Sequence, residues 1–133
     1  MTIFSRIIAG EIPCYKIAED EQFFAFLDIN PLAKGHTLVV PKVEIDYLFD
    51  LDDSTLAGMI VFAKKVGVAI EKAIPCNRIG LTVIGLEVPH AHIHLIPINC
   101  EADMNFQNPK LKLSSDEMSV IANRVATLFQ AQS

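Results

Sequence analysis

Three of the four histidines in the 133-residue sequence stand at alternate positions, in a segment where residues 90–94 read His-Ala-His-Ile-His. Alternate side chains of a β-strand lie on one face of the sheet. His90, His92 and His94 are therefore expected to share a face, while the apolar residues between them point into a core. A single histidine on a strand is usually structural, but a row of three has few purely structural explanations. We expect this row to carry the chemistry of the protein.

Two kinds of chemistry fit a row of imidazoles. A His-x-His pair can bind one metal ion, but His90 and His94 lie about 13 Å apart along an extended strand, so a third ligand would come from elsewhere. Alternatively, an imidazole nitrogen can attack phosphorus while its neighbours donate hydrogen bonds to the phosphate oxygens. This second chemistry needs a neutral nucleophile with donors beside it, and His92 has an imidazole on each side.

The elements that would position this row can be predicted from apolar periodicity and turn residues. Apolar and β-branched runs predict five strands, and the acidic turn at residues 19–21 joins the first two as a hairpin. A short helix with Thr2 as its cap is expected near the N-terminus. A second is expected at the C-terminus, where Ser114 and Glu117 have the spacing of a capping box. The predicted strands are residues 14–18, 22–27, 36–40, 79–84 and 90–98, and the predicted terminal helices are residues 2–9 and 114–131.

The longest predicted element is a helix over residues 54–74, capped by Asp52 or Asp53. Its other side also carries apolar residues, which could pack on a partner subunit or under a loop; these are Ala57, Val61 and Val68. Strands near the start, this helix between them and a helix at the end indicate an α+β fold with a mostly antiparallel, five-stranded sheet. The stripe expected to be buried is Leu56, Met59, Ile60, Ala63, Val66, Gly67, Ile70 and Ile74.

Composition excludes several classes of protein. The chain is 51% hydrophobic with a net charge of −5, so one folded domain over residues 1–133 is expected, with residues 114–131 as a C-terminal helical extension. An acidic chain is unsuited to coating a nucleic-acid backbone, although one pocket can be locally positive. The sequence has no signal-peptide pattern and no run of about 20 apolar residues, which predicts a cytoplasmic protein without membrane contact. The three cysteines lack a Cys-x-x-Cys pair and are expected to be free thiols.

The pattern of residues 90–96, His-φ-His-φ-His-φ-φ with φ an apolar residue, resembles the signature of the histidine-triad (HIT) superfamily. Three further blocks resemble this family in the same order, and the region after about Asn99 falls outside the resemblance. These blocks are residues 3–13, 25–31 and 35–42. The chain is most similar to the histidine-triad nucleotide-binding, or Hint-like, branch.

The resemblance implies a hydrolase or transferase of purine nucleotides, in which His92 attacks the α-phosphate and forms a nucleotidyl-histidine that water hydrolyses. His94 would hydrogen-bond a phosphate oxygen or the leaving group, and His90 would support the nucleophile through its other nitrogen. His36, on the neighbouring strand, would join the network. Relatives pair through the long helix and an adjoining strand, which implies a homodimer with a larger joined sheet. No cofactor is implied.

The resemblance also implies where the nucleotide lies. Asp28 matches the position whose carboxylate holds the ribose hydroxyls, and Asn30 follows it in the same binding block. The purine slot would combine Ile29 with four residues for which core packing is an equal explanation, namely Phe4, Ile7, Phe26 and Leu38.

The loop before the triad departs from the family pattern. Leu86 stands where glutamine is usual, and Glu87 replaces a hydroxyl residue that helps to protonate the leaving group. An ionised Glu87 would repel a phosphate, whereas a buried one with a raised pKa could act as a general acid; a solvated loop residue is the alternative. The Cys-x-x-Cys zinc element of some relatives is also missing, with Thr2 and Ser5 at those positions, so no structural metal is expected.

The primary hypothesis is an enzyme that acts on nucleoside phosphoramidates or related small nucleotides. The alternatives are a dinucleoside polyphosphate hydrolase and a nucleotide-binding module with weak or vestigial catalysis. A metal-dependent enzyme that uses His90 and His92 is the weakest rival. The sequence leaves base preference and leaving group open, because the enzymes would differ in the altered loop.

Overall fold

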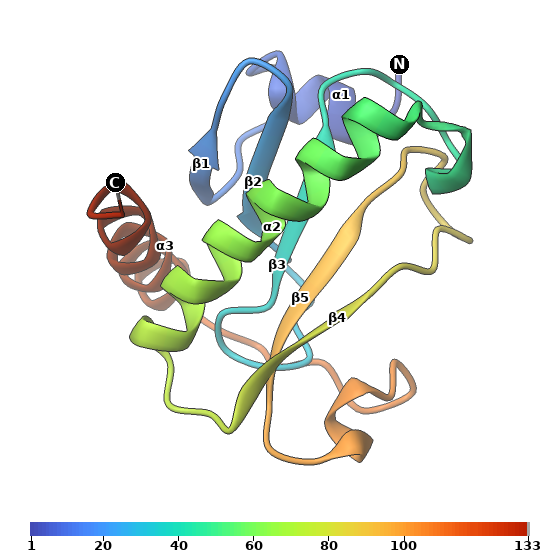
Figure 1. The fold of residues 1–133 in the computed structure, drawn as a ribbon. Helices are drawn as coiled ribbons and strands as arrows, with labels where there is room; N and C mark the ends of the chain where they lie inside the picture. Colours follow the sequence, from blue (N-terminus) through green and yellow to red (C-terminus); the bar gives the residue numbers. More distant parts are fainter. Residues whose placement is uncertain (133) are drawn as a thin grey trace.

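A five-stranded antiparallel sheet with the strand order β1-β2-β3-β5-β4 organises the structure (Figure 1). The computed structural model describes residues 1–132. It confirms the α+β class and the five strands expected from the sequence. In chain order the elements are α1 (Ile3–Ile8), β1 (Lys16–Glu19), β2 (Phe23–Leu27), β3 (Thr37–Pro41), the 3-10 helix η1 (Leu48–Asp50), α2 (Asp53–Ala73), β4 (Arg78–Thr82), β5 (Ile93–Ile98), the 3-10 helix η2 (Glu101–Met104) and α3 (Ser115–Gln130).

The three α-helices begin at caps that the sequence predicts. The side chains of Thr2, Asp52 and Ser114 each accept a hydrogen bond from the backbone N–H three residues further on. These bonds satisfy N–H groups that have no partner inside a helix. Both terminal helices are therefore confirmed.

The sheet is covered on both faces, which explains why β2 is buried along its whole length. Alternate residues of a strand point to opposite faces, so each face belongs to a different core. Phe23, Ala25 and Leu27 join the larger core, which α2 and α3 cover. Phe24 and Phe26 join a smaller core beneath α1. In Figure 1 α2 crosses in front of the sheet, with α3 beside it.

The buried stripe of α2 differs from the expected one. Ile60 is exposed, while Phe62 is buried and packs against Phe23 and Phe129, with ring centroids 5.7 Å away in both cases. The C-terminal helix causes the difference, because α3 lies beside α2 and covers the side that carries Phe62. Of the apolar residues on the other side of the helix, Ala57 and Val61 are exposed and Val68 is half-buried.

The histidine strand begins later than predicted. β5 starts at Ile93 rather than at His90, so His90 and His92 lie in the extended segment before it. The ladder with β3 ends because Pro41, the last residue of β3, has no N–H to donate. The backbone N–H of Ala91 donates to the carbonyl of Ile45 instead, at 2.7 Å.

A tight turn delivers His36 to the start of β3. Gly35 has a φ of +90°, a conformation that L side chains rarely adopt, and a Cβ there would lie 2.9 Å from Cγ1 of Ile74. Both the positive φ at this position and the lack of space for a Cβ therefore require glycine. None of the helices in residues 1–132 has the length and apolar character needed to cross a membrane.

Candidate active site

All four histidines gather on the α1 side of the sheet, although His36 is far from the other three in sequence. The pairing of β3 with β5 brings them together, because Leu38 lies opposite His94 in the ladder. The four side chains are buried, with His94 the most exposed at 8%. Burying four polar rings requires a partner for each nitrogen that water no longer reaches. Within residues 1–132, each buried side-chain nitrogen and oxygen atom has such a partner.

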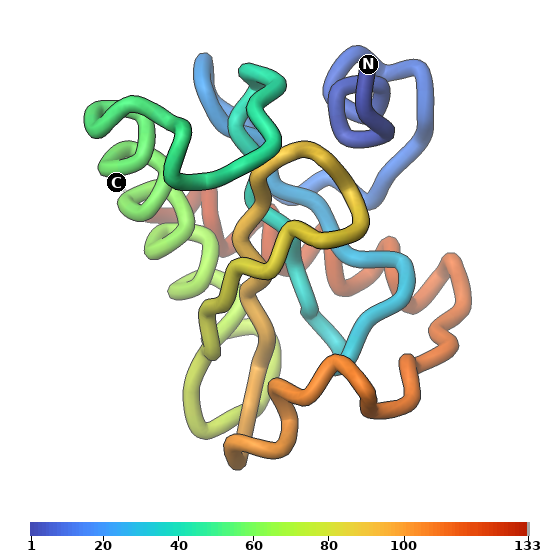
Figure 2. The backbone as a smooth tube through the Cα atoms, turned by 90° about the vertical axis from the view of Figure 1, so that its right-hand side faces the viewer, coloured from blue at the N-terminus to red at the C-terminus, as the bar shows by residue number. Residues whose placement is uncertain are grey.

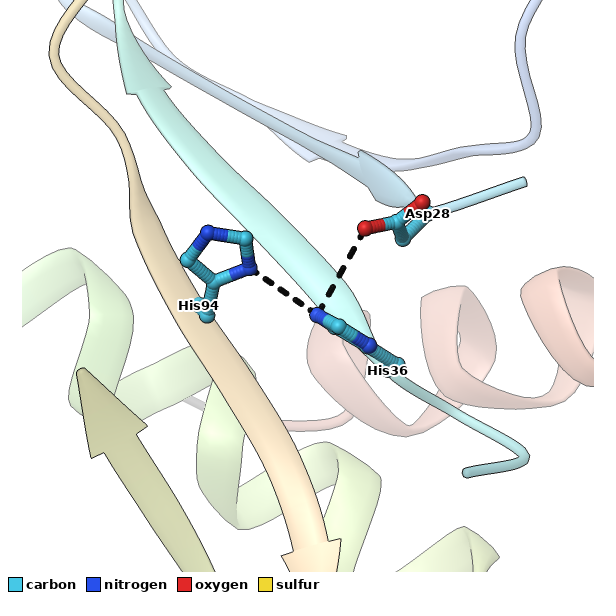
Figure 3. Close-up of side chains that lie close together, drawn as sticks. All are labelled: Asp28, His36 and His94. Carbon is cyan, nitrogen blue, oxygen red and sulfur yellow. Dashed lines mark hydrogen bonds and ion pairs between the residues drawn. The ribbon is translucent and has the colours of Figure 1, made fainter. Parts of the chain in front are cut away.

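A chain of hydrogen bonds fixes the protons of His36 and His94 (Figure 3). The backbone N–H of Leu32 donates to Nδ1 of His36 at 3.0 Å, so this nitrogen carries no proton. The proton of the neutral His36 ring is then on Nε2, which lies 3.0 Å from Nδ1 of His94 and donates to it. His94 therefore holds its own proton on Nε2. The series of hydrogen bonds therefore ends in an outward-facing N–H donor on His94.

His92 is held in the opposite tautomer. Its Nδ1 lies 2.7 Å from the backbone carbonyl of His90, and because a carbonyl only accepts, Nδ1 carries the proton. Nε2 of His92 is then an unprotonated nitrogen with a free electron pair, as a nucleophile requires. The ring centroids of His92 and His94 are 4.9 Å apart. A bare nitrogen and an N–H donor thus stand side by side.

The carbonyl of His90 holds the ring of His92, while the ring of His90 anchors the N-terminal helix. Nε2 of His90 donates to the carbonyl of Pro41 at 2.8 Å, and Nδ1 lies within hydrogen-bonding distance of the hydroxyl of Thr2, at 2.8 Å. Glu44 accepts from the backbone N–H of Thr2 and from the hydroxyl of Ser5, at 2.6 and 2.7 Å. Thr2, Ser5, Glu44 and His90 therefore form a polar clamp between α1 and the triad.

Burial keeps three of the four rings uncharged at neutral pH. Loss of hydration lowers the pKa of His36 from 6.5 to about 3, with His94 and Lys110 as further causes. Loss of hydration and the charge of His92 lower the pKa of His94 to about 4. The pKa of His92 is also lowered, again mainly by burial. Nε2 of His92 therefore retains its electron pair at physiological pH.

Asp28 directly follows β2 and lies beside the histidine pair. Its Oδ1 accepts from the backbone N–H of Asn30 at 2.8 Å, and its Oδ2 lies 3.6 Å from Nε2 of His36 (Figure 3). Burial raises the pKa of this carboxyl, and Lys110 opposes that change. Asp28, His36 and His94 are also the one group in residues 1–132 whose ligand atoms could hold a metal ion. This group does not include His92 or His90, the pair on which the metal-dependent alternative rests.

The apolar residues predicted to hold the base are brought together, with one exception. Phe4, Ile7, Phe26 and Leu38 lie in the smaller core under α1. Phe4 also packs edge-on against His92, with ring centroids 5.0 Å apart. Ile29 is 69% exposed and is not part of this cluster, and Asn30 is exposed as well. The cluster therefore adjoins the nucleophile without Ile29.

The altered loop before the triad lies at the surface. Leu86 is 89% exposed, and Glu87 is exposed. Glu87 therefore lacks the burial that a general acid with a raised pKa would require. Its charge still reaches the site, because it contributes to the raised pKa of Asp28.

Two residues of the site escape the sequence analysis. Phe106 packs edge-on against His94, with centroids 4.9 Å apart, and its neighbour Lys110 acts electrostatically on Asp28 and His36. Both lie between β5 and α3, in a region treated above only as leading to the last helix. A single aromatic and a single lysine in a polar loop give no periodic signal that could have identified them.

Comparisons with known proteins agree with the fold. The family model described as "HIT domain" matches residues 9–100. Adenosine 5'-monophosphoramidase hnt1 of Schizosaccharomyces pombe is 35% identical over 130 residues, covering 94% of this chain and 96% of that protein. Adenylylsulfatase HINT3 of Arabidopsis thaliana is 37% identical over 100 residues, covering 71% of this chain and 51% of that protein. The crystal structure of a HIT-like protein from Bartonella henselae superimposes with a TM-score of 0.82 at 30% identity, covering 96% and 95% of the two chains. The chain belongs to the HIT family.

The lowered histidine pKa values predict how stability depends on pH. Below pH 6.5 these histidines are protonated in the unfolded chain. In the folded protein His94 becomes protonated only near pH 4, and His36 only near pH 3. The free energy of unfolding should therefore fall as pH decreases from about 7 to 4, by up to about 1.4 kcal/mol per pH unit for each such group. The raised pKa of Asp28 works in the opposite direction and offsets part of the loss.

Urea unfolding at several pH values measures this dependence. The His36→Gln variant is the control, because it removes one titrating ring and should lose stability less steeply. A parent protein whose stability is constant or increases from pH 7 to pH 4 would contradict the neutral, buried state of the site.

Proposed function

We propose that this protein hydrolyses a purine nucleotide at its α-phosphate, with a phosphoramidate or a similar compound as substrate, through a nucleotidyl intermediate on His92. The observation that carries the proposal is the opposite tautomers of two adjacent rings. His92 presents a bare Nε2, and His94 presents an N–H beside it. Attack on phosphorus needs both groups at once.

In the first half-reaction the electron pair on Nε2 of His92 forms a bond to the α-phosphorus. The bond from phosphorus to the leaving group breaks, and its electron pair leaves with that group. As Nε2 becomes bonded, positive charge develops on the imidazole. The carbonyl of His90 stabilises this charge because it already accepts the proton on Nδ1. His94 donates its N–H hydrogen bond to an oxygen on phosphorus or to the leaving atom.

In the second half-reaction water attacks the same phosphorus, displaces Nε2 of His92 and gives up a proton to solvent. This proton balances the one that an amine leaving group takes up from solvent in the first half-reaction. The nitrogen recovers its electron pair, and the nucleoside monophosphate is released. His36 keeps His94 in its donor tautomer through both steps, since the bond from the N–H of Leu32 leaves His36 no other arrangement. The protein returns to its starting state without a net change in protonation.

The remaining residues position the nucleotide. The apolar cluster around Phe4 and Phe26 adjoins His92, and because both rings are buried a purine would lie against the edge of this cluster. The carboxylate of Asp28 lies at the rim of the site, where ribose hydroxyls would donate to it. Catalysis is favoured over a vestigial binding module because the histidine network is complete in residues 1–132 without Leu86 or Glu87. The names of the yeast and plant relatives, a monophosphoramidase and an adenylylsulfatase, support hydrolysis.

The central prediction of this proposal concerns His92. His92→Ala should lower turnover of adenosine 5′-phosphoramidate by about 1,000-fold or more, because it removes the attacking atom. Binding of AMP should weaken much less, since the apolar cluster and Asp28 remain. Rapid acid-free quenching with radiolabelled substrate, followed by peptide mapping, should place the label on His92 in the parent protein.

The matched control is His94→Ala, which keeps the attacking nitrogen and removes the neighbouring donor. It should turn over slowly and still accumulate label on His92. Label on His90 or His94, or near-normal turnover by His92→Ala, would refute the proposed mechanism.

We also propose that the chain forms a homodimer through α2 and the free edge of β4. β4 is an edge strand, and an unpaired edge with apolar side chains invites pairing. Leu81 on β4 is 48% exposed, and Val61 on α2 is 68% exposed. α2 and β4 are in contact, so the two elements offer a joint apolar surface.

Analytical ultracentrifugation tests the dimer. The parent protein should sediment as a dimer at micromolar concentration, and the double variant Val61→Lys/Leu81→Lys as a monomer. Val120→Lys is the matched control, because Val120 is equally exposed but lies on α3. A monomeric parent protein, or a dimer that persists in the double variant, would disprove this interface.

A further inference from the structure

The segment between β5 and α3 forms a wall of the histidine site. It begins with η2 and continues as a loop to residue 114, outside the family-matched residues 9–100. The backbone N–H of Leu111 donates to the carbonyl of Pro31 at 2.9 Å, which fastens this loop to the loop that follows Asp28. Figure 2 shows the orange segment running beside the tip of the cyan loop that leads into β3. The segment therefore has a fixed place beside the site.

Phe106 extends the row of rings across the site. Its centroid lies 4.9 Å from that of His94 and 6.2 Å from that of His36, edge-on in both cases. On the other side of His92, Phe4 makes a similar edge-on contact at 5.0 Å. His92 and His94 thus lie in a row of rings that has Phe4 at one end, near α1, and Phe106 at the other end, on the loop.

Lys110 adds a positive charge to the second end. Its Nζ lies 6.0 Å from the centroid of Phe106 and donates to the carbonyl oxygens of Phe106 and Asn108, at 2.5 and 3.2 Å. Carbonyl oxygens hold the ammonium in place without neutralising it. Its charge reaches the site, because Lys110 opposes the rise in the pKa of Asp28 and contributes to the lowered pKa of His36.

The two ends of the row differ in the chemistry that they can bind. The end at Phe4 is a buried apolar cluster, beside which a purine would lie. The end at Phe106 is beside His94 and carries the ammonium of Lys110. A nucleotide with its base at the first end and its α-phosphorus at His92 would direct the group attached to phosphorus toward the second end.

We propose that Lys110 is a specificity-determining residue that binds an anionic leaving group. It raises the rate on adenylyl compounds that release sulfate, phosphate or a second nucleotide, and it leaves the rate on phosphoramidates, which release a neutral amine, unchanged. This inference rests on the proposed hydrolysis at the α-phosphate. It assigns a function to a loop outside the matched family residues. Phe106 is the platform that positions the lysine.

Kinetics of Lys110→Met test the inference, with adenosine 5′-phosphosulfate as the anionic substrate and adenosine 5′-phosphoramidate as the other. The value of kcat/KM for the phosphosulfate should fall about tenfold, as expected for one hydrogen bond to a charged group. The value for the phosphoramidate should stay within about twofold, because its leaving group offers Lys110 no negative charge to bind. Lys110→Arg keeps the charge and should restore the phosphosulfate reaction. Lys112→Met is the matched control on the same loop and should change neither value.

Equal losses on both substrates would place Lys110 at the ribose or the α-phosphate and overturn the inference, as would unchanged values for both. Failure of the proposed function has a different signature, since the parent protein would then hydrolyse neither compound. Calorimetric titration with ADP and AMP tests Lys110 in that case as well. Lys110→Met should weaken binding of ADP more than binding of AMP, and an unchanged ratio of the two affinities would overturn the inference.

Discussion

The hydrogen bond from the backbone N–H of Leu32 to Nδ1 of His36 determines the chemistry of the whole site. A backbone N–H can only donate, so it forces the proton of the neutral His36 ring onto Nε2 and, through the next bond, the proton of His94 onto its outer nitrogen. The carbonyl of His90 has the opposite effect on His92. A carbonyl can only accept a hydrogen bond, so the proton of His92 is on Nδ1. Two backbone groups thus give one imidazole an outward N–H and its neighbour a bare nitrogen, although the side chains are chemically identical.

The fold brings the hydrogen-bonded histidines together, and burying their rings lowers the stability of the protein. The turn at Gly35 and the pairing of β3 with β5 place His36 and His94 in hydrogen-bonding distance although 58 residues separate them. Layers on both faces of the sheet remove water, which lowers the histidine pKa values and keeps the rings neutral. The polar clamp of Thr2 and Glu44 holds α1 against His90 and so sets Phe4 beside His92. Burial of the histidines therefore costs stability, and the same burial keeps their rings neutral.

Much of this arrangement follows from local patterns. Caps and apolar periodicity are short-range signals, so Thr2, Asp52 and Ser114 identified the helices, and alternation placed the triad on one face. Features that depend on residues far away in the sequence could not be predicted from these local patterns. β5 begins at Ile93 because Pro41 on another strand ends the ladder, and Phe62 is buried because α3 covers it. The clamp at Glu44 and the wall at Phe106 depend on loops that meet only in three dimensions.

Direct observation of the imidazole protons tests this account most closely. Long-range proton–nitrogen correlation spectra of protein labelled with ¹⁵N histidine, recorded near pH 7, distinguish protonated from bare ring nitrogens. We expect His92 to carry its proton on Nδ1 with Nε2 bare, and His36 and His94 to carry theirs on Nε2 with Nδ1 bare. A spectrum with a protonated Nε2 on His92, or a bare Nε2 on His94, would contradict the assignment of nucleophile and donor.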